Sequence, residues 1–140
     1  MTDVNQSGAS GFTLIELMVA VAILAIVMAI AIPSYQNYVT RTNRAEAKVL
    51  LSSVSQALER CYTRYTAYDA DDCTVGFPQQ SENGWYQMAE DDQTIDATTY
   101  ELVAVPQGTQ ATRDTDCGNF TLTQNATRGV SGSADVEDCW

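Results

Sequence analysis

Hydrophobic positions concentrate in one stretch near the start of the chain. Residues 12–32 (FTLIELMVAVAILAIVMAIAI) contain 19 apolar residues out of 21, whereas residues 33–140 contain 41 out of 108. As a helix, this stretch would be about 31 Å long at about 1.5 Å per residue, which matches the hydrocarbon core of a bilayer. The pattern therefore predicts one membrane-spanning helix attached to a soluble region.

A second pattern, between residues 34 and 65, has the period of an amphipathic helix. Apolar residues recur there at spacings of three and four, on a single stripe formed by Ala47, Leu51, Val54, Leu58, Cys61 and Tyr65. Such a stripe packs on a sheet or pairs in a coiled coil, and three heptads are short for a coiled coil. We therefore expect packing on a sheet. Pro33 removes one hydrogen bond between the two helical halves and can kink the helix there.

Three later runs have the composition of strands. They are residues 84–88, residues 98–105 and residues 119–124, of which the last alternates polar and apolar positions. Residues 66–83 show no sustained period and predict a loop. The fold class predicted is therefore α+β: a long N-terminal helix, with a membrane half and an amphipathic half, packed on a small antiparallel sheet.

Charge is as uneven as hydrophobicity. The net charge of −11 divides into −2 for residues 1–33, +3 for residues 34–64 and −12 for residues 65–140. Binding to nucleic acid phosphates needs a basic face, so we expect no direct nucleic acid binding by the acidic part.

The sequence has few of the residue types that catalysis or metal binding requires. The sequence contains no histidine, which excludes Ser-His-Asp and Cys-His sites and any imidazole metal ligand. The acidic residues of 69–72 approach an EF-hand spacing but lack the later oxygen ligands, and the run at 90–92 is typical of a solvated turn. We therefore predict no enzyme activity, no metal site and no cofactor.

Glu16 is the one carboxylate inside the apolar run. A charge at the centre of a membrane helix costs about 2.5–3.5 kcal/mol on insertion scales. One interpretation is that Glu16, four residues into the run, reaches the headgroups. The other is that it pairs with a cation, which a free α-amino group would supply if the chain were cut before Phe12.

The start of the run resembles a known family signature. Residues 11–16 (GFTLIE) resemble the type IV pilin motif, and Pro33 matches a proline of that family. Residues 34–39 (SYQNYV) and the Cys-Trp pair at 139–140 are similar to pilin subunits, particularly PilE-like minor pilins. The resemblance implies the ladle-shaped pilin fold. It implies a leader peptide at 1–11, a transmembrane and polymerisation helix at 12–33, and a periplasmic or extracellular head at 34–140.

The resemblance also implies a mechanism. A prepilin peptidase of the inner membrane would cut between Gly11 and Phe12, and Phe12 would be N-methylated. Glu16 would pair with the Phe12 amine of a neighbouring subunit and set axial register as the helix enters the filament. The expected partners are other pilin subunits in a helical filament, the peptidase and assembly machinery, and the membrane before assembly.

A structural subunit of a type IV pilus, serving motility, adhesion or DNA uptake, is thus the function that the resemblance implies. A minor pilin is favoured over a major pilin. A type II secretion pseudopilin is the remaining alternative, although major pseudopilins often lack a C-terminal disulfide.

Orientation is predicted differently by two signals. The leader carries no basic residue, and Arg41, Arg44 and Lys48 follow the apolar run, so the positive-inside rule alone would place the C-terminal part in the cytoplasm. The family resemblance and the even number of cysteines place it outside, where disulfides form. We expect the latter arrangement.

The four cysteines, Cys61, Cys73, Cys117 and Cys139, allow three disulfide connectivities. Only 14 Ile, Leu and Val residues lie between 33 and 140, so the core is thin and disulfides would contribute strongly. Following the pilin resemblance, we prefer Cys61–Cys73 with Cys117–Cys139. The alternative is Cys61–Cys139 with Cys73–Cys117.

Overall fold

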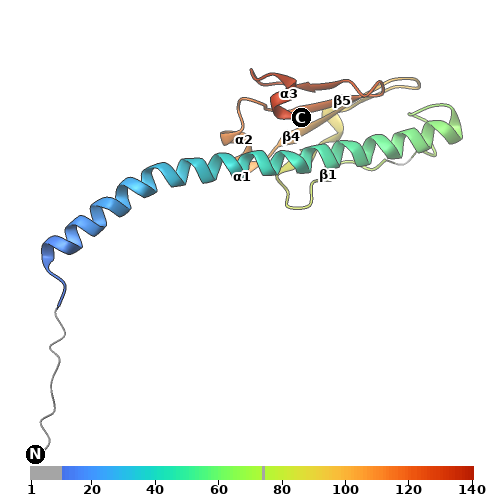
Figure 1. The fold of residues 1–140 in the computed structure, drawn as a ribbon. Helices are drawn as coiled ribbons and strands as arrows, with labels where there is room; N and C mark the ends of the chain where they lie inside the picture. The colour runs from blue at the N-terminus through green and yellow to red at the C-terminus, as the bar shows by residue number, and fades with distance from the viewer. Residues whose placement is uncertain (1–10, 74) are drawn as a thin grey trace, which may run out of the picture. The chain divides into compact units, whose positions relative to one another are not determined.

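The structure, a computed structural model, describes residues 11–73 and 75–140. It divides into two units, one ending at Asn37 and the other, the head, comprising Tyr38–Trp140. Helix α1 (Leu14–Tyr65) contributes to both units (Figure 1). The predicted leader, apart from Gly11, lies outside the described residues.

The first half of α1 is the predicted membrane-length segment. Within the described part of the chain, α1 alone is long and apolar enough to cross a membrane, and the qualifying stretch has a mean hydropathy of 2.9 with none of it buried. Pro33 lies inside the helix, which continues through it. Because proline has no amide hydrogen, one hydrogen bond of the helical ladder is missing there.

The second half of α1 packs on the sheet with the predicted stripe. Ala47, Leu51, Val54 and Leu58 are at most 1% exposed, and Leu50 beside them is buried too. Cys61 and Tyr65, at the end of the stripe, are half-buried. Figure 1 shows α1 lying along the sheet. The stripe is therefore covered by strands within the same chain, which confirms the prediction of a helix on a sheet.

The sheet has six strands, and every pairing is antiparallel. Its order is β1-β2-β4-β5-β6, with β3 paired to the free edge of β4 near its start. The strands are β1 (Gln79–Gln80), β2 (Tyr86–Met88), β3 (Thr94–Ile95), β4 (Tyr100–Pro106), β5 (Phe120–Thr123) and β6 (Arg128–Val130). The three predicted strands correspond to β2, β4 and β5.

Alternation along β4 and β5 builds the sheet side of the core. Tyr100, Leu102 and Ala104 face inward from β4, while Phe120 and Leu122 face inward from β5. The register places Leu102 opposite Leu122 and Ala104 opposite Phe120. These pairs meet the apolar stripe of α1 in one hydrophobic cluster.

Short elements complete the head. They are a 3-10 turn (Glu90–Asp92), α2 (Gly108–Arg113) and α3 (Val136–Cys139). None of them, nor β1, β3 and β6, was expected from the pattern. Each has two to six residues, which is too short to show a helical or strand period. In particular, β1 lies inside the predicted loop of residues 66–83 and forms through backbone pairing with β2.

Candidate assembly site

The predicted processing site lies just before α1. Gly11 and Phe12 have no helical or strand structure, and Phe12 is 91% exposed. The Gly11–Phe12 bond therefore lies in accessible, irregular backbone.

Glu16 takes part in a capping box at the start of α1. The Glu16 backbone N–H donates to Thr13 Oγ1 over 3.3 Å. In return, the Glu16 carboxylate accepts from the Thr13 backbone N–H at 2.9 Å and from the Thr13 hydroxyl at 2.8 Å. Each side chain thus satisfies an amide that the helix leaves without a partner. The negative charge also lies at the positive end of the helix dipole.

Downstream of this box the helix presents apolar side chains on all sides. The large apolar residues from Phe12 to Ile32 are between 49% and 91% exposed. Covering a large apolar side chain is worth about 1.5–3 kcal/mol, so this surface strongly favours an apolar environment such as lipid or other helices.

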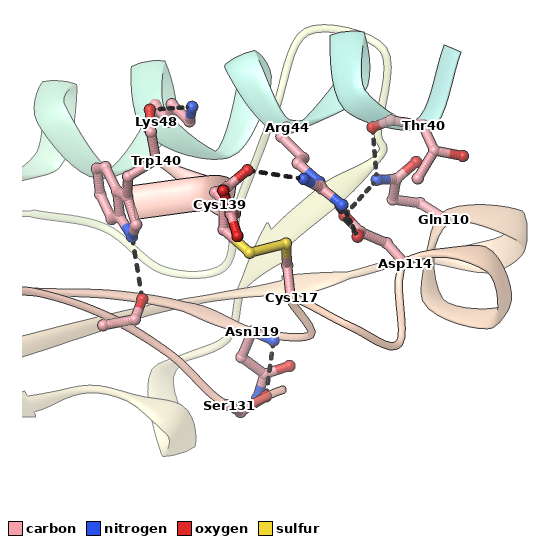
Figure 2. The surroundings of a disulfide bond; sticks show 12 residues. Thr40, Arg44, Lys48, Gln110, Asp114, Cys117, Asn119, Ser131, Cys139 and Trp140 are labelled. Atoms are coloured by element: carbon pink, nitrogen blue, oxygen red, sulfur yellow. Dashed lines mark hydrogen bonds and ion pairs between the residues drawn. A yellow bond between two sulfur atoms is a disulfide. The ribbon is translucent and has the colours of Figure 1, made fainter. Parts of the chain in front are cut away.

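The head contains a buried ion pair that fastens α1 to the sheet side (Figure 2). Arg44 of α1 donates to Asp114, the residue after α2, with an Nη2–Oδ1 distance of 2.7 Å and two further Nε contacts of 3.0 and 3.1 Å. The Asp114 side chain is 0% exposed and that of Arg44 is 13% exposed. The fork geometry makes this a bidentate, charge-assisted pair.

Gln110 extends the network from Asp114 to the helix backbone. Its amide nitrogen lies 2.9 Å from Asp114 Oδ2, 3.1 Å from the Tyr86 hydroxyl and 3.1 Å from the Thr40 carbonyl, so its two hydrogens are shared among three acceptors. The Tyr86 hydroxyl also donates to Asp114 over 3.1 Å. In the described residues no buried side-chain nitrogen or oxygen is left without a partner. The network is therefore fully satisfied, as a buried polar cluster must be to avoid a desolvation cost.

The segment around α3 is bonded to α1 through Arg44 and through Lys48, which lies one helical turn later. Arg44 Nη1 donates to the Asp138 carbonyl at 3.2 Å, and Lys48 donates to the Trp140 carbonyl. The Trp140 indole N–H donates to the Gly129 carbonyl over 3.0 Å, while the Arg128 guanidinium lies 5.1 Å from the Trp140 ring centre. Figure 2 shows the contacts of Arg44, Lys48 and Trp140 around the Cys117–Cys139 disulfide.

Both disulfides follow the preferred pairing, Cys61–Cys73 and Cys117–Cys139. The first connects the last turn of α1 to the loop after it. The second joins α3 to the segment preceding β5, and both of its residues are buried. Loops of 12 and 22 residues are closed, each worth about 3 kcal/mol by chain-entropy arithmetic.

Burial shifts the pKa of several groups in the head. It raises the pKa of the Tyr68 hydroxyl to about 12, with a further contribution from the bond that this hydroxyl donates to Glu59. Burial likewise raises the pKa of Tyr86. It lowers the pKa of Lys48, and the positive charges of Arg44 and Arg128 act in the same direction.

Two groups of residues escaped sequence reasoning. Thr13 could have been found, because Thr-x-x-Glu before an apolar run is a capping-box signature. Asp114 and Gln110 could not, because nothing in the local pattern marks a polar residue as buried. The proposed roles of Gly11, Phe12, Glu16 and Pro33 remain predictions, since the structure places these residues but does not show what they do.

Comparison with known proteins identifies the family. Residues 33–121 match the family described as "Type IV minor pilin ComP, DNA uptake sequence receptor", and residues 6–32 match the prokaryotic N-terminal methylation motif. The first match alone covers more than half of the chain. This protein belongs to the type IV pilin family. The pilin resemblance seen in the sequence is thereby confirmed.

Relatives of this pilin include fimbrial subunits of several bacteria. It is 41% identical over 76 residues to the fimbrial protein EcpC of Eikenella corrodens, covering 54% of this chain and 49% of EcpC. It is 37% identical over 71 residues to the type IV major pilin PilE of Neisseria gonorrhoeae, covering 51% and 42% respectively. The chain spans about half the length of the curated relatives it matches.

The fold is shared with a solved pilin structure. The minor pilin PilV of Neisseria meningitidis superposes with a TM-score of 0.51 at 20% identity, covering 68% of this chain and 89% of PilV. The predicted architecture, a long helix packed on an antiparallel sheet, is thus confirmed as the pilin fold.

Proposed function

We propose that this pilin is a minor subunit of a type IV pilus, with a structural role and no enzyme activity. The observation that carries the proposal is the helix half whose large apolar side chains between residues 12 and 32 are 49–91% exposed, within a match to the N-terminal methylation motif at residues 6–32. Such a segment suits a membrane before assembly and the apolar interior of a filament afterwards. Type IV pilins assemble with other pilin subunits, which are the partners we propose here.

Processing is the first proposed step. An inner-membrane prepilin peptidase cuts between Gly11 and Phe12, removing residues 1–11, and Phe12 is methylated. The exposed, non-helical backbone at this bond supports the proposal, because a protease must bind its substrate in an extended form. Residues 12–33 then hold the pilin in the membrane with the head in the periplasm.

Register is the second proposed step. The Thr13 donors hold the Glu16 carboxylate at the start of α1, within one helical turn of Phe12. Cleavage would create an amine at Phe12, and in an apolar filament interior this amine would pair with a Glu16 carboxylate of a neighbouring subunit. An uncompensated charge there would be costly, so Glu16→Gln should sharply lower incorporation into filaments. Normal incorporation of that variant would refute the register role.

The choice between minor and major pilin rests on the family match. The matching family is described as a minor pilin, whereas PilE is described as a major pilin. A pseudopilin of a secretion machine is the other alternative, and the Cys117–Cys139 disulfide favours a pilus subunit. The deciding measurement is quantitative mass spectrometry of sheared surface filaments. We expect this chain at a few per cent or less of total pilin, beginning at methylated Phe12.

DNA binding is a second candidate, because the matching family is described as a receptor for a DNA uptake sequence. The charges of this chain argue against it. Arg44 is paired with Asp114, Lys48 is bound to the Trp140 carbonyl, and residues 65–140 carry a net charge of −12. We therefore propose that any contribution to DNA uptake is made through the filament. A gel-shift titration at low salt tests this, and micromolar binding to duplex DNA would refute it.

A further inference from the structure

An apolar groove opens on the head between α1 and the segment around β1. Its floor is made by Ala45, Val49 and Leu50 of α1, its other wall by residues 79–82, and its volume is about 360 Å³. Val49 is 69% exposed although it is apolar. No residue of the described chain fills this groove, so an apolar side chain from outside could occupy it.

The rim of the groove is acidic. Glu46 and Glu82 both line it, and Glu82 makes no hydrogen bond or ion pair within the described residues. Glu46 accepts from the backbone and side-chain nitrogens of Asn83 at 3.2 and 2.6 Å. Partial burial works against ionisation of Glu46, but donors on Ser81 and Asn83 outweigh it and hold its pKa below the ordinary value. Two carboxylates thus surround an apolar floor.

A complementary feature lies elsewhere on the head's part of α1. Tyr38 is 69% exposed, and Arg41, three residues later, is exposed on the neighbouring side of the helix. Arg41 forms no ion pair or hydrogen bond with any residue that the structure describes. The exposed ring of Tyr38 is complementary to the apolar floor of the groove, and the positive charge of Arg41 is complementary to the carboxylates of its rim.

We propose that the groove beside Val49 receives the stem of a neighbouring pilin subunit, meaning the turn of α1 that carries Tyr38 and Arg41. The Tyr38 ring would lie on Val49, and the Arg41 guanidinium would lie between Glu46 and Glu82. The inference rests on the proposed function. In a filament whose subunits all point the same way, the groove of one subunit meets Tyr38 and Arg41 of the next, so the contact is heterologous and repeats along the filament. The same two surfaces paired by a two-fold axis would instead give a closed dimer.

Charge reversal at the rim tests the contact in cells that assemble filaments from the full chain. Glu82→Arg should lower the amount of this pilin in sheared filaments about fivefold or more, because one attraction becomes a repulsion of similar size. Its level in the membrane should not change. The matched control is Glu101→Arg, which reverses an exposed carboxylate on β4 away from the groove and should assemble normally. Equal incorporation of both variants would overturn the inference.

A photo-reactive benzoylphenylalanine at Val49 identifies the occupant. We expect an adduct with a pilin subunit, mapped by mass spectrometry to its stem at the positions of Tyr38 and Arg41. Adducts only with lipid, with another protein class or with a different part of a pilin would overturn the inference. Absence of the unaltered chain from filaments would instead refute the proposed function, so the two failures are distinguishable.

Discussion

Replacing Arg44 by alanine removes the only cation paired with a fully buried carboxylate among the described residues. Asp114 would keep its contacts with Tyr86 and Gln110, but these neutral donors do not compensate a charge that is 0% exposed. Removing one partner of a buried pair costs about 3–5 kcal/mol, because the other charge is left desolvated. Small domains have about 5–15 kcal/mol in total, so Arg44→Ala should remove a large share of the stability of the head.

The partner substitution should be milder. In Asp114→Ala the guanidinium of Arg44, already 13% exposed, can turn towards water, and Gln110 and Tyr86 still bond to each other. Removing both charges at once, in Arg44→Met with Asp114→Leu, should cost less than Arg44→Ala alone, because apolar replacements of a buried pair are often neutral. Asp114→Ala is thus predicted to be more stable than Arg44→Ala, although it removes more side-chain hydrogen bonds.

Urea unfolding of the full chain in detergent micelles, with disulfides intact, measures these differences through the fluorescence of Trp85 and Trp140. A loss of 4 kcal/mol at a slope of about 2 kcal/mol/M would lower the midpoint by about 2 M. The matched control is Arg113→Ala, which removes an exposed arginine of α2 and should change stability by less than about 0.5 kcal/mol. A cost below about 1 kcal/mol for Arg44→Ala would refute the reasoning.

Three further outcomes are expected. A folded pKa of about 12 for Tyr68, above its unfolded value of 10, means that its contribution to stability is present below pH 10 and lost as pH rises through 12. In an alkaline titration of the native protein, the tyrosinate absorbance that a Tyr68→Phe variant lacks should therefore appear near pH 12, and a missing component centred at pH 10 would contradict this. Gly118→Ala should be destabilising in thermal melts by about 1–3 kcal/mol, because φ is +63° and a Cβ would lie 2.4 Å from the Ser131 hydroxyl; an unchanged melting temperature would count against it. Cys117→Ser with Cys139→Ser should cost about 3 kcal/mol in the same melts, and a loss below 1 kcal/mol would show that the surrounding contacts suffice.

The long elements of the pilin could be predicted from sequence because their periods repeat often enough to be read. The stripe from Ala47 to Leu58 repeats through three turns, and β4 alternates over seven residues. By contrast, β1 and β3 have two residues each and exist only through backbone pairing with longer strands. A segment of that length carries no period, so its structure is decided by its neighbours.

The residues of the candidate assembly site also differ in whether they could be predicted from sequence. Gly11, Phe12 and Glu16 belong to one contiguous motif, and such motifs can be recognised without a fold. The cluster of Arg44 and Asp114 joins residues 70 positions apart, and an aspartate near α2 looks like any exposed acid until the fold brings α1 over it. Composition therefore does not distinguish the exposed acids of the head from Asp114, whose carboxylate is the centre of a buried network.

The fastening of α3 to α1 also has a consequence for how the head acquires its structure. The contacts of Arg44 with residue 138 and of Lys48 with residue 140 span 94 and 92 positions. Contacts of such high sequence separation form late, because the entropy cost of closing a long loop comes before the contacts can stabilise the head. In a nascent chain the apolar stripe of α1 is covered only after β4 and β5 have emerged, and the contacts of Arg44 and Lys48 with α3 and Trp140 form only after residues 138–140 have followed. Until then the uncovered stripe is open to aggregation and proteolysis.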